Sequence, residues 1–156
     1  MTGSSVQKPS NHPRVLIASD GSSGADKAIH FAVGLFKQSP ADFRIVTVLS
    51  YELYPYAIYG PPENFPLSDA DKRLELIKRT EEKAAKALGE GEGVHSLTTT
   101  HRFGHPQEEL VREMEEWKPE MVVVGRQGLG HLERLMLGSV SSFLVKHSPV
   151  PVLVVP

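Results

Sequence analysis

Cysteine is absent from this sequence, which excludes disulfides, thiolate metal sites and cysteine nucleophiles. No stretch approaches the ~20 apolar residues of a membrane span, and residues 1–13 lack the apolar core of a signal peptide. The formal net charge is −2, so the chain has no general attraction to nucleic acid or to an anionic membrane. Together these absences predict a cytoplasmic protein with neither a nucleic-acid nor a membrane partner.

What the chain does contain fits one folded domain. Of its 156 residues, 40% are hydrophobic and 23% are charged, as in ordinary soluble proteins. Residues 1–13 are polar and include Pro9 and Pro13, so we expect a disordered N-terminal tail. The domain itself is expected to span residues 14–156.

Strand and helix patterns alternate along this domain. Five short segments are predicted to be strands: residues 14–19, 43–50, 94–103, 120–125 and 151–155. Four helical patterns lie between them and begin near Ser23, Ser68, Pro106 and Ser139. Such alternation produces right-handed crossovers and a parallel sheet with helices on both faces. The fold class is therefore α/β, a single doubly wound domain.

Three of these elements carry further expectations. Ser23 and Asp26 match a capping box, so Ser23 is the expected N-cap of the first helix. Many threonines in residues 94–103 suggest a strand nearer the sheet edge. The inner face expected of the third helix consists of Leu110, Val111, Met114 and Trp117. The acidic residues of that helix are expected to form a solvated face: Glu108, Glu109, Glu113, Glu115 and Glu116.

The stretch GRQGLGHLERLMLGS, residues 125–139, lies between a predicted strand and a predicted helix. In doubly wound sheets, ligands bind at the carboxyl ends of the strands. A helix N-terminus there presents free amides to an anion, and glycine lets phosphate oxygens approach closely. The stretch therefore predicts a phosphate-binding loop, with ordinary glycine turns as the alternative. It is not a Walker loop, because no Gly-Lys-Ser/Thr follows.

The spacing of these glycines also resembles a known motif. Gly125, Gly128 and the pair Gly138-Ser139 resemble the nucleotide-binding signature of the universal stress protein family, in its ATP-binding subgroup. Residues 15–22 and 140–156 resemble the first strand and turn, and the final helix and strand, of that family. The resemblance covers about residues 13–156. It implies a five-stranded parallel sheet in the order 3-2-1-4-5 that binds ATP in many members.

The same resemblance implies nine site residues, with ATP as the ligand and Mg²⁺ or Mn²⁺ as a candidate metal on its phosphates. The residues expected around the adenine and the ribose are Ala18, Asp20, Val48, Val124 and Gly125. The residues expected at the phosphates are Gly128, Gly138, Ser139 and Val140. Arg126, Gln127 and His131 occupy positions that vary in the family, so they receive no role.

Individual residues leave alternatives open. Asp20 could bind a ribose hydroxyl or a metal, or it could form an Asx turn at the start of the first helix. His101 and His105 have a metal-like spacing, but they fall across a strand end, which favours structural roles. Residues 51–67 contain all four tyrosines and four prolines, and are predicted to be a loop that packs beside the sheet or covers the ligand.

Two classes of function fit this architecture. The first is a regulatory protein of the stress response that binds ATP and changes its contacts with partners. The second is an enzyme, either a slow ATP hydrolase or a nucleotidyl transferase, which would need a base and charge stabilisation at the phosphate. The sequence has no GxSxG elbow and no HExxH motif, so we favour the regulator. A flavin-binding or receiver-like domain is a third and weaker possibility. A receiver domain would have two acidic residues after its first strand, whereas this sequence has one, Asp20.

The last predicted strand also indicates a partner. PVPVLVVP, residues 149–156, is almost wholly apolar and would leave an unpaired sheet edge in a monomer. Members of the family that this chain resembles commonly dimerise there. We therefore expect a homodimer joined through the C-terminal strand.

Overall fold

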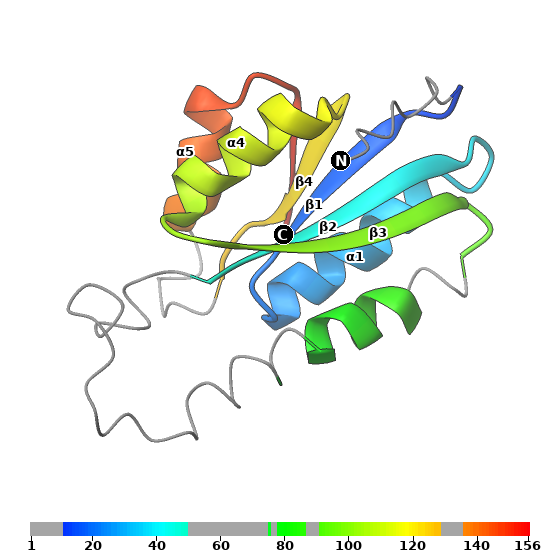
Figure 1. Cartoon of the computed structure of the whole chain (residues 1–156), viewed down its shortest axis with the longest axis horizontal. Helices are drawn as coiled ribbons and strands as arrows, with labels where there is room; N and C mark the ends of the chain where they lie inside the picture. Colours follow the sequence, from blue (N-terminus) through cyan, green and yellow to red (C-terminus); the bar gives the residue numbers. More distant parts are fainter. Residues whose placement is uncertain (1–10, 50–74, 76–77, 87–90, 129–135) are drawn as a thin grey trace, which may run out of the picture.

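The computed structural model describes residues 11–49, 75, 78–86, 91–128 and 136–156. Within these ranges, five parallel strands form one sheet in the order β3-β2-β1-β4-β5 (Figure 1). The strands are β1 (Arg14–Ser19), β2 (Ala41–Leu49), β3 (Val94–Phe103), β4 (Met121–Gly125) and β5 (Val152–Val155). The predicted fold class and strand order are confirmed, and the threonine-rich β3 is an edge strand.

Helices cover both faces of this sheet. On one face, α1 (Ser23–Leu35) lies beside the helical residues 78–86, and on the other lie α4 (Pro106–Trp117) and α5 (Ser139–His147) (Figure 1). Lys83 Nζ donates a hydrogen bond of 3.0 Å to Asp26 Oδ2, which links residues 78–86 to α1. Among the described residues, none of the helices is both long and apolar enough to cross a membrane.

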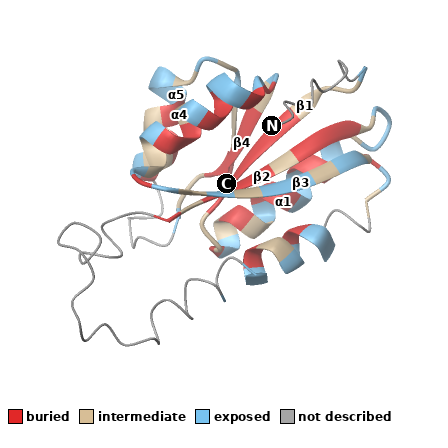
Figure 2. Ribbon diagram, viewed as in Figure 1, coloured by how far each residue is buried: buried red, intermediate tan, exposed pale blue. Residues whose placement is uncertain are grey.

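The central strand β1 explains why the sheet needs both layers. Its side chains alternate between two cores, with Val15 and Ile17 in the α1 core and Leu16 and Ala18 in the α4 and α5 core. All four are buried, and β1 is drawn largely in the red of buried residues in Figure 2. A strand covered on both faces needs apolar residues at every position, which is why its sequence shows no alternation.

The predicted N-cap of α1 is wrong by one residue. Ser22, not Ser23, caps the helix, and its Oγ accepts a hydrogen bond of 3.2 Å from the amide of Ala25. Gly21 has a φ of 79°, a left-handed conformation that glycine adopts without strain. This residue turns the chain directly after β1, so Ser22 reaches the cap position.

The predicted solvated face of α4 is also wrong for two of its five acidic residues. Glu109 and Glu113 are buried, whereas Val111, expected inside, is half-buried. In a helix, positions 109 and 113 directly flank the stripe formed by Leu110 and its neighbours, so they reach the sheet. Charge does not prevent their burial because arginines from the sheet meet them there.

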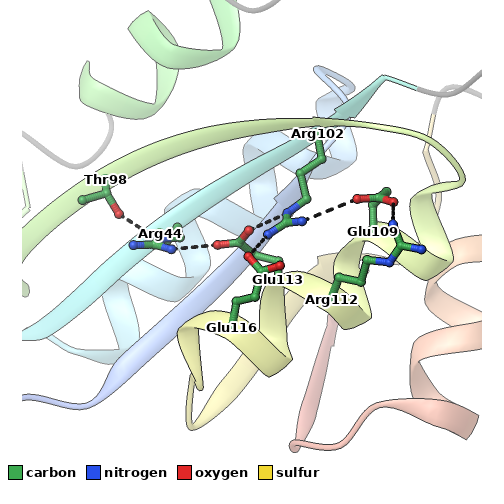
Figure 3. A network of polar contacts seen from close by, with 7 residues as sticks. All are labelled: Arg44, Thr98, Arg102, Glu109, Arg112, Glu113 and Glu116. Atoms are coloured by element: carbon green, nitrogen blue, oxygen red, sulfur yellow. Dashed lines mark hydrogen bonds and ion pairs between the residues drawn. The ribbon is translucent and has the colours of Figure 1, made fainter. Parts of the chain in front are cut away.

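These arginines come from two neighbouring strands (Figure 3). Arg44 Nη1 of β2 donates to Glu113 Oε1 at 2.8 Å, and Arg102 Nε of β3 donates to Glu113 Oε2 at 2.6 Å. Arg102 also pairs with Glu116 and, at 3.5 Å, with Glu109. Burial alone would lower the pKa of Arg102, but its hydrogen bonds to Glu113 and Glu116 raise that pKa above the ordinary value.

Several sequence predictions fall outside the described residues. They are the loop 51–67 with its tyrosines, the helix start at Ser68, and His131. Of the predicted tail, the structure describes residues 11–13.

We expect Glu113→Ala to lower the free energy of unfolding by about 3 kcal/mol, because it leaves Arg44 and Arg102 without their shared carboxylate in a largely buried site. Urea unfolding followed by circular dichroism would measure this loss. Glu115→Ala, an exposed residue on the same helix, is the matched control and should change stability by about 0.5 kcal/mol or less. Equal effects of the two substitutions would contradict a structural role for the buried carboxylate.

Candidate functional site

A pocket of about 230 Å³ opens at the carboxyl ends of β1, β2 and β4. β1 pairs with β2 on one side and with β4 on the other, so the pocket lies where the strand order reverses. All nine residues that the sequence indicated line it: Ala18, Asp20, Val48, Val124, Gly125, Gly128, Gly138, Ser139 and Val140. Residues that are far apart in the sequence therefore meet in one place.

One side of the pocket is apolar. It is formed by Val46 and Val48 of β2 together with Pro106 and Leu110 of α4. The sequence analysis did not identify Val46, Pro106 and Leu110 as pocket residues, because apolar residues in such elements are expected in the core. Position in the fold could have indicated Pro106, which begins the helix that follows the carboxyl end of β3. This side can hold a flat aromatic group.

The N-terminus of α5 also lines the pocket, and it lies beside the start of α4, where Gln107 Nε2 donates a hydrogen bond of 3.4 Å to Ser139 O. Gly138 is the N-cap of α5, and no side chain caps this end of the helix. The first amide that bonds within the helix is that of Ser142, which donates to Gly138 O at 2.9 Å. The amides of Ser139, Val140 and Ser141 therefore have no acceptor inside α5. Together with the helix dipole, these donors favour an anion.

Asp20 supplies the carboxylate among the described residues of this pocket. Its Oδ1 accepts a hydrogen bond of 2.9 Å from the amide of Ser22, which is the Asx turn that the sequence offered as an alternative. The two interpretations are compatible, because the turn uses one oxygen of a carboxylate that also lines the pocket. The turn holds the side chain in place at the end of β1.

The glycines of residues 125–138 meet different constraints. A Cβ on Gly128 would lie 2.3 Å from Asp20 Oδ2, so a side chain there would displace the carboxylate. A Cβ on Gly125 would lie 2.8 Å from the backbone C and O atoms of Gly24, where β4 meets the first turn of α1. Gly125 is thus required for packing as well as lining the pocket. Gly138 has an ordinary φ of −64°, but a Cβ there would lie 3.3 Å from Arg126 O, which is a tight contact with backbone.

The described part of the pocket has few side chains that could act as an acid, a base or a metal ligand. The described lining residues include no histidine, lysine or arginine. The part of the chain that the structure describes contains no cluster of three or more His, Cys, Asp or Glu that could hold a metal. His101 packs edge-on against Phe103 at 5.8 Å between ring centroids, and His105 precedes α4 as its N-cap residue, so both have structural positions.

Gly125→Ala tests the packing constraint. We expect it to cost about 2 kcal/mol or more of unfolding free energy, because the added methyl meets rigid backbone rather than a movable side chain. Gly34→Ala is the matched control in α1, since nothing lies within 4 Å of its Cβ. That substitution should stabilise the helix by about 0.5–1 kcal/mol. Thermal melts of both variants would measure this, and a neutral Gly125→Ala would show that β4 and α1 can separate freely.

Comparison with known proteins gives a consistent result. The model of the universal stress protein family matches residues 12–156. A Staphylococcus epidermidis relative that carries the universal stress protein name is 33% identical over 147 residues, which cover 93% of this chain and 84% of that protein. The solved structure of hypothetical protein MJ0577 is similar with a TM-score of 0.76 and 24% identity, over 92% of this chain and 95% of that chain. A solved universal stress protein in complex with cAMP has a TM-score of 0.61 and 25% identity, over 94% and 98% of the two chains.

Proposed function

The chain belongs to the universal stress protein family, and from this premise we propose that it is a regulatory protein of the stress response whose pocket binds ATP. The observation that carries the proposal is the pocket itself, in which an apolar slot faces the uncapped N-terminus of α5. A nucleotide has the same two parts, a flat base and a chain of anions. The similar protein in complex with cAMP supports an adenine nucleotide as the ligand class.

Backbone geometry at the end of β2 favours adenine in the apolar slot. The amide of Asp42 donates to Pro13 O on the β1 side of β2, whereas the carbonyl of Leu49 accepts from Gly104 N on the β3 side. Even-numbered residues of β2 therefore point their amides and carbonyls toward β1, and odd-numbered residues point theirs toward β3. β1 ends at Ser19, opposite Thr47. No residue of β1 is left to donate to the carbonyl of Val48, which can accept the amino group of an adenine.

The phosphates would lie at the N-terminus of α5, with Ser139 adding a hydroxyl donor. Asp20 fits a Mg²⁺ or Mn²⁺ ion that also binds the phosphates, because Mg²⁺ in nucleotide sites uses one or two carboxylates together with phosphate oxygens. The ion would supply charge neutralisation. Asp20 would hold it through oxygens of a side chain that the Asx turn already fixes.

Regulation is favoured over catalysis by the chemistry of the pocket. Phosphoryl transfer needs charge stabilisation at the γ-phosphate and a residue that orients the attacking group. The described lining residues offer Asp20 and neutral groups, with no cationic side chain. A slow ATP hydrolase or nucleotidyl transferase is the alternative, and a cytoplasmic location remains a prediction.

Two substitutions of Ser139 test the phosphate site. Ser139→Ala removes only the hydroxyl and should weaken ATP binding about fivefold to tenfold. Ser139→Pro also removes an amide, while the helix should form because proline suits its first position and Gly138 already has the extended conformation that precedes proline. We expect the proline variant to lose more ATP affinity than the alanine variant, by isothermal titration calorimetry.

Adenosine is the control ligand for these measurements, since it lacks the phosphates and should bind all three proteins alike. Thermal melts would confirm that the variants are folded. Equal ATP affinities of the wild type and Ser139→Pro would contradict phosphate binding at α5. Rapid release of ADP by the wild type would instead favour the enzyme.

We also propose a homodimer through β5. β5 pairs with β4 alone in the sheet, and Arg126 N donates to Val155 O, so odd-numbered residues of β5 face β4 and the amide of Val154 points outward. Val154→Pro should therefore remove an edge donor and give a monomer by light scattering. Thr99→Pro at the opposite edge is the matched control and should leave the dimer intact. A wild-type monomer at micromolar concentration would contradict the proposal.

A further inference from the structure

We propose that Ser141 and Gln127 are positioning residues of the pocket, whose side chains hold together the two ends of the glycine-rich segment and thereby aim the α5 amides at the ligand phosphates. The inference rests on the proposed nucleotide site. Both residues also line the pocket, and the role proposed for them acts through the backbone of the segment that they hold. The two ends are residues 126–128, which follow β4, and residues 136–138, which precede α5.

Ser141 joins these ends from inside the protein. Its side chain is buried, with 1% of the residue exposed. Its Oγ lies 2.8 Å from Arg126 O and 3.1 Å from Gly138 O, so the hydroxyl proton is shared between one carbonyl at each end. The amide of Gly138 donates to the same Arg126 carbonyl at 2.8 Å. Arg126 and Gly138 are therefore fixed relative to each other by backbone and side chain together.

This joint is anchored to the sheet. The amide of Arg126 donates to Val155 O of β5 at 2.8 Å, while the carbonyl of the same residue accepts from Gly138 and Ser141. The carbonyl of Gly138 accepts from Ser142 N at 2.9 Å, as well as facing the Ser141 hydroxyl. These bonds hold the first turn of α5, whose Ser139, Val140 and Ser141 line the pocket and have amides without an acceptor inside the helix.

Gln127 makes a second connection nearer the pocket. Its Nε2 donates to Met136 O at 3.1 Å, which again links one end to the other. The backbone of Gln127 packs closely against two glycines. A Cβ added to Gly24 would lie 2.6 Å from Gln127 O, and one added to Gly138 would lie 3.5 Å from Gln127 Cα. The backbone of Gln127 is thus held by α1 and α5, and its side chain holds Met136.

Fixing donors before the ligand arrives reduces the cost of ordering them on binding. Without the connections, the amides would still exist, but part of the binding free energy would be used to bring them into place. The loss should then depend on the number of phosphates that the ligand presents. Adenosine, which reaches only the apolar slot and the ribose region, should not respond.

Calorimetry on the full chain with ATP and with adenosine tests this inference. Ser141→Ala should weaken ATP binding about tenfold, and Gln127→Met, which keeps the length of the side chain but not the donor, should weaken it about threefold. Adenosine affinity should stay within about twofold of the wild type for both variants. Ser142→Ala, one residue farther along α5 and half-buried, is the matched control and should bind both ligands like the wild type.

Both variants are expected to fold. After Ser141→Ala, Arg126 O retains the amide of Gly138 and Gly138 O retains the amide of Ser142, so no carbonyl loses its last donor. The Gln127 hydrogen bond is exposed, so its removal leaves no buried polar group. If Ser141→Ala fails to fold, the ATP and adenosine affinities of Gln127→Met therefore test the positioning role.

Each outcome separates the two proposals. Unchanged ATP affinity, or an equal loss of ATP and adenosine affinity, would overturn the positioning role and leave the nucleotide site intact. A wild type that binds neither ligand would overturn the proposed function, and the positioning role with it.

Discussion

The early end of β1 is the constraint on which the rest of the site depends. β1 stops at Ser19, opposite Thr47, while β2 continues through Val48 and Leu49. The chain turns away at Asp20 and Gly21, where a left-handed φ of 79° places Ser22 at the start of α1. The gap left in the middle of the sheet exposes backbone groups of β2 on one side and of the β4 end on the other. Residues of both strand ends, Val48 and Val124 among them, line the pocket together with apolar side chains, which is an environment that would suit the base of the proposed nucleotide.

Close backbone packing and ligand binding share the same glycines. Gly125 allows the end of β4 to approach Gly24 in α1, and Gly128 leaves room for the Asp20 carboxylate. Neither constraint involves a ligand, yet both place backbone atoms around the pocket. A glycine motif of this kind therefore indicates close backbone packing first, and under the proposed function the free amides of α5 would bind an anion beside it. The glycine turns and a phosphate-binding loop, posed as alternatives from the sequence, do not exclude each other.

The sequence predicted the sheet well because buried strands have uninterrupted apolar runs, and the glycine spacing marked the loop. The other lining residues, such as Ala18 and Val48, were indicated only by the resemblance to the universal stress protein family, and the structure places them in one pocket. The burial of Glu113 could not be predicted from the sequence, because it depends on Arg44 and Arg102, and Glu109 pairs with Arg102 as well as with Arg112 of its own helix. Arg44 lies 69 residues from Glu113 in the chain, and Arg102 lies 11 residues from it. Charged residues beside an apolar stripe are usually solvated, so only the three-dimensional pairing shows otherwise. Pro106 and Leu110 were missed for a related reason, since the same stripe serves both the core and the pocket.

The two sides of the pocket are held by different forces. On the α5 side, the hydrogen bonds that join Arg126 to Gly138 and Ser141 span at most 15 residues. The amide of Arg126 also donates to Val155 O of β5, which lies farther along the chain. On the α4 side, Pro106 and Leu110 belong to the helix whose buried glutamates pair with β2 and β3 (Figure 3). The α5 side of the pocket is thus connected to the β5 edge of the sheet and the α4 side to β2 and β3, and Gln107 Nε2 of α4 joins the two sides through a hydrogen bond of 3.4 Å to Ser139 O. Under the proposed function, a nucleotide that contacts both sides would stabilise the folded chain, because it would bind only when both are formed.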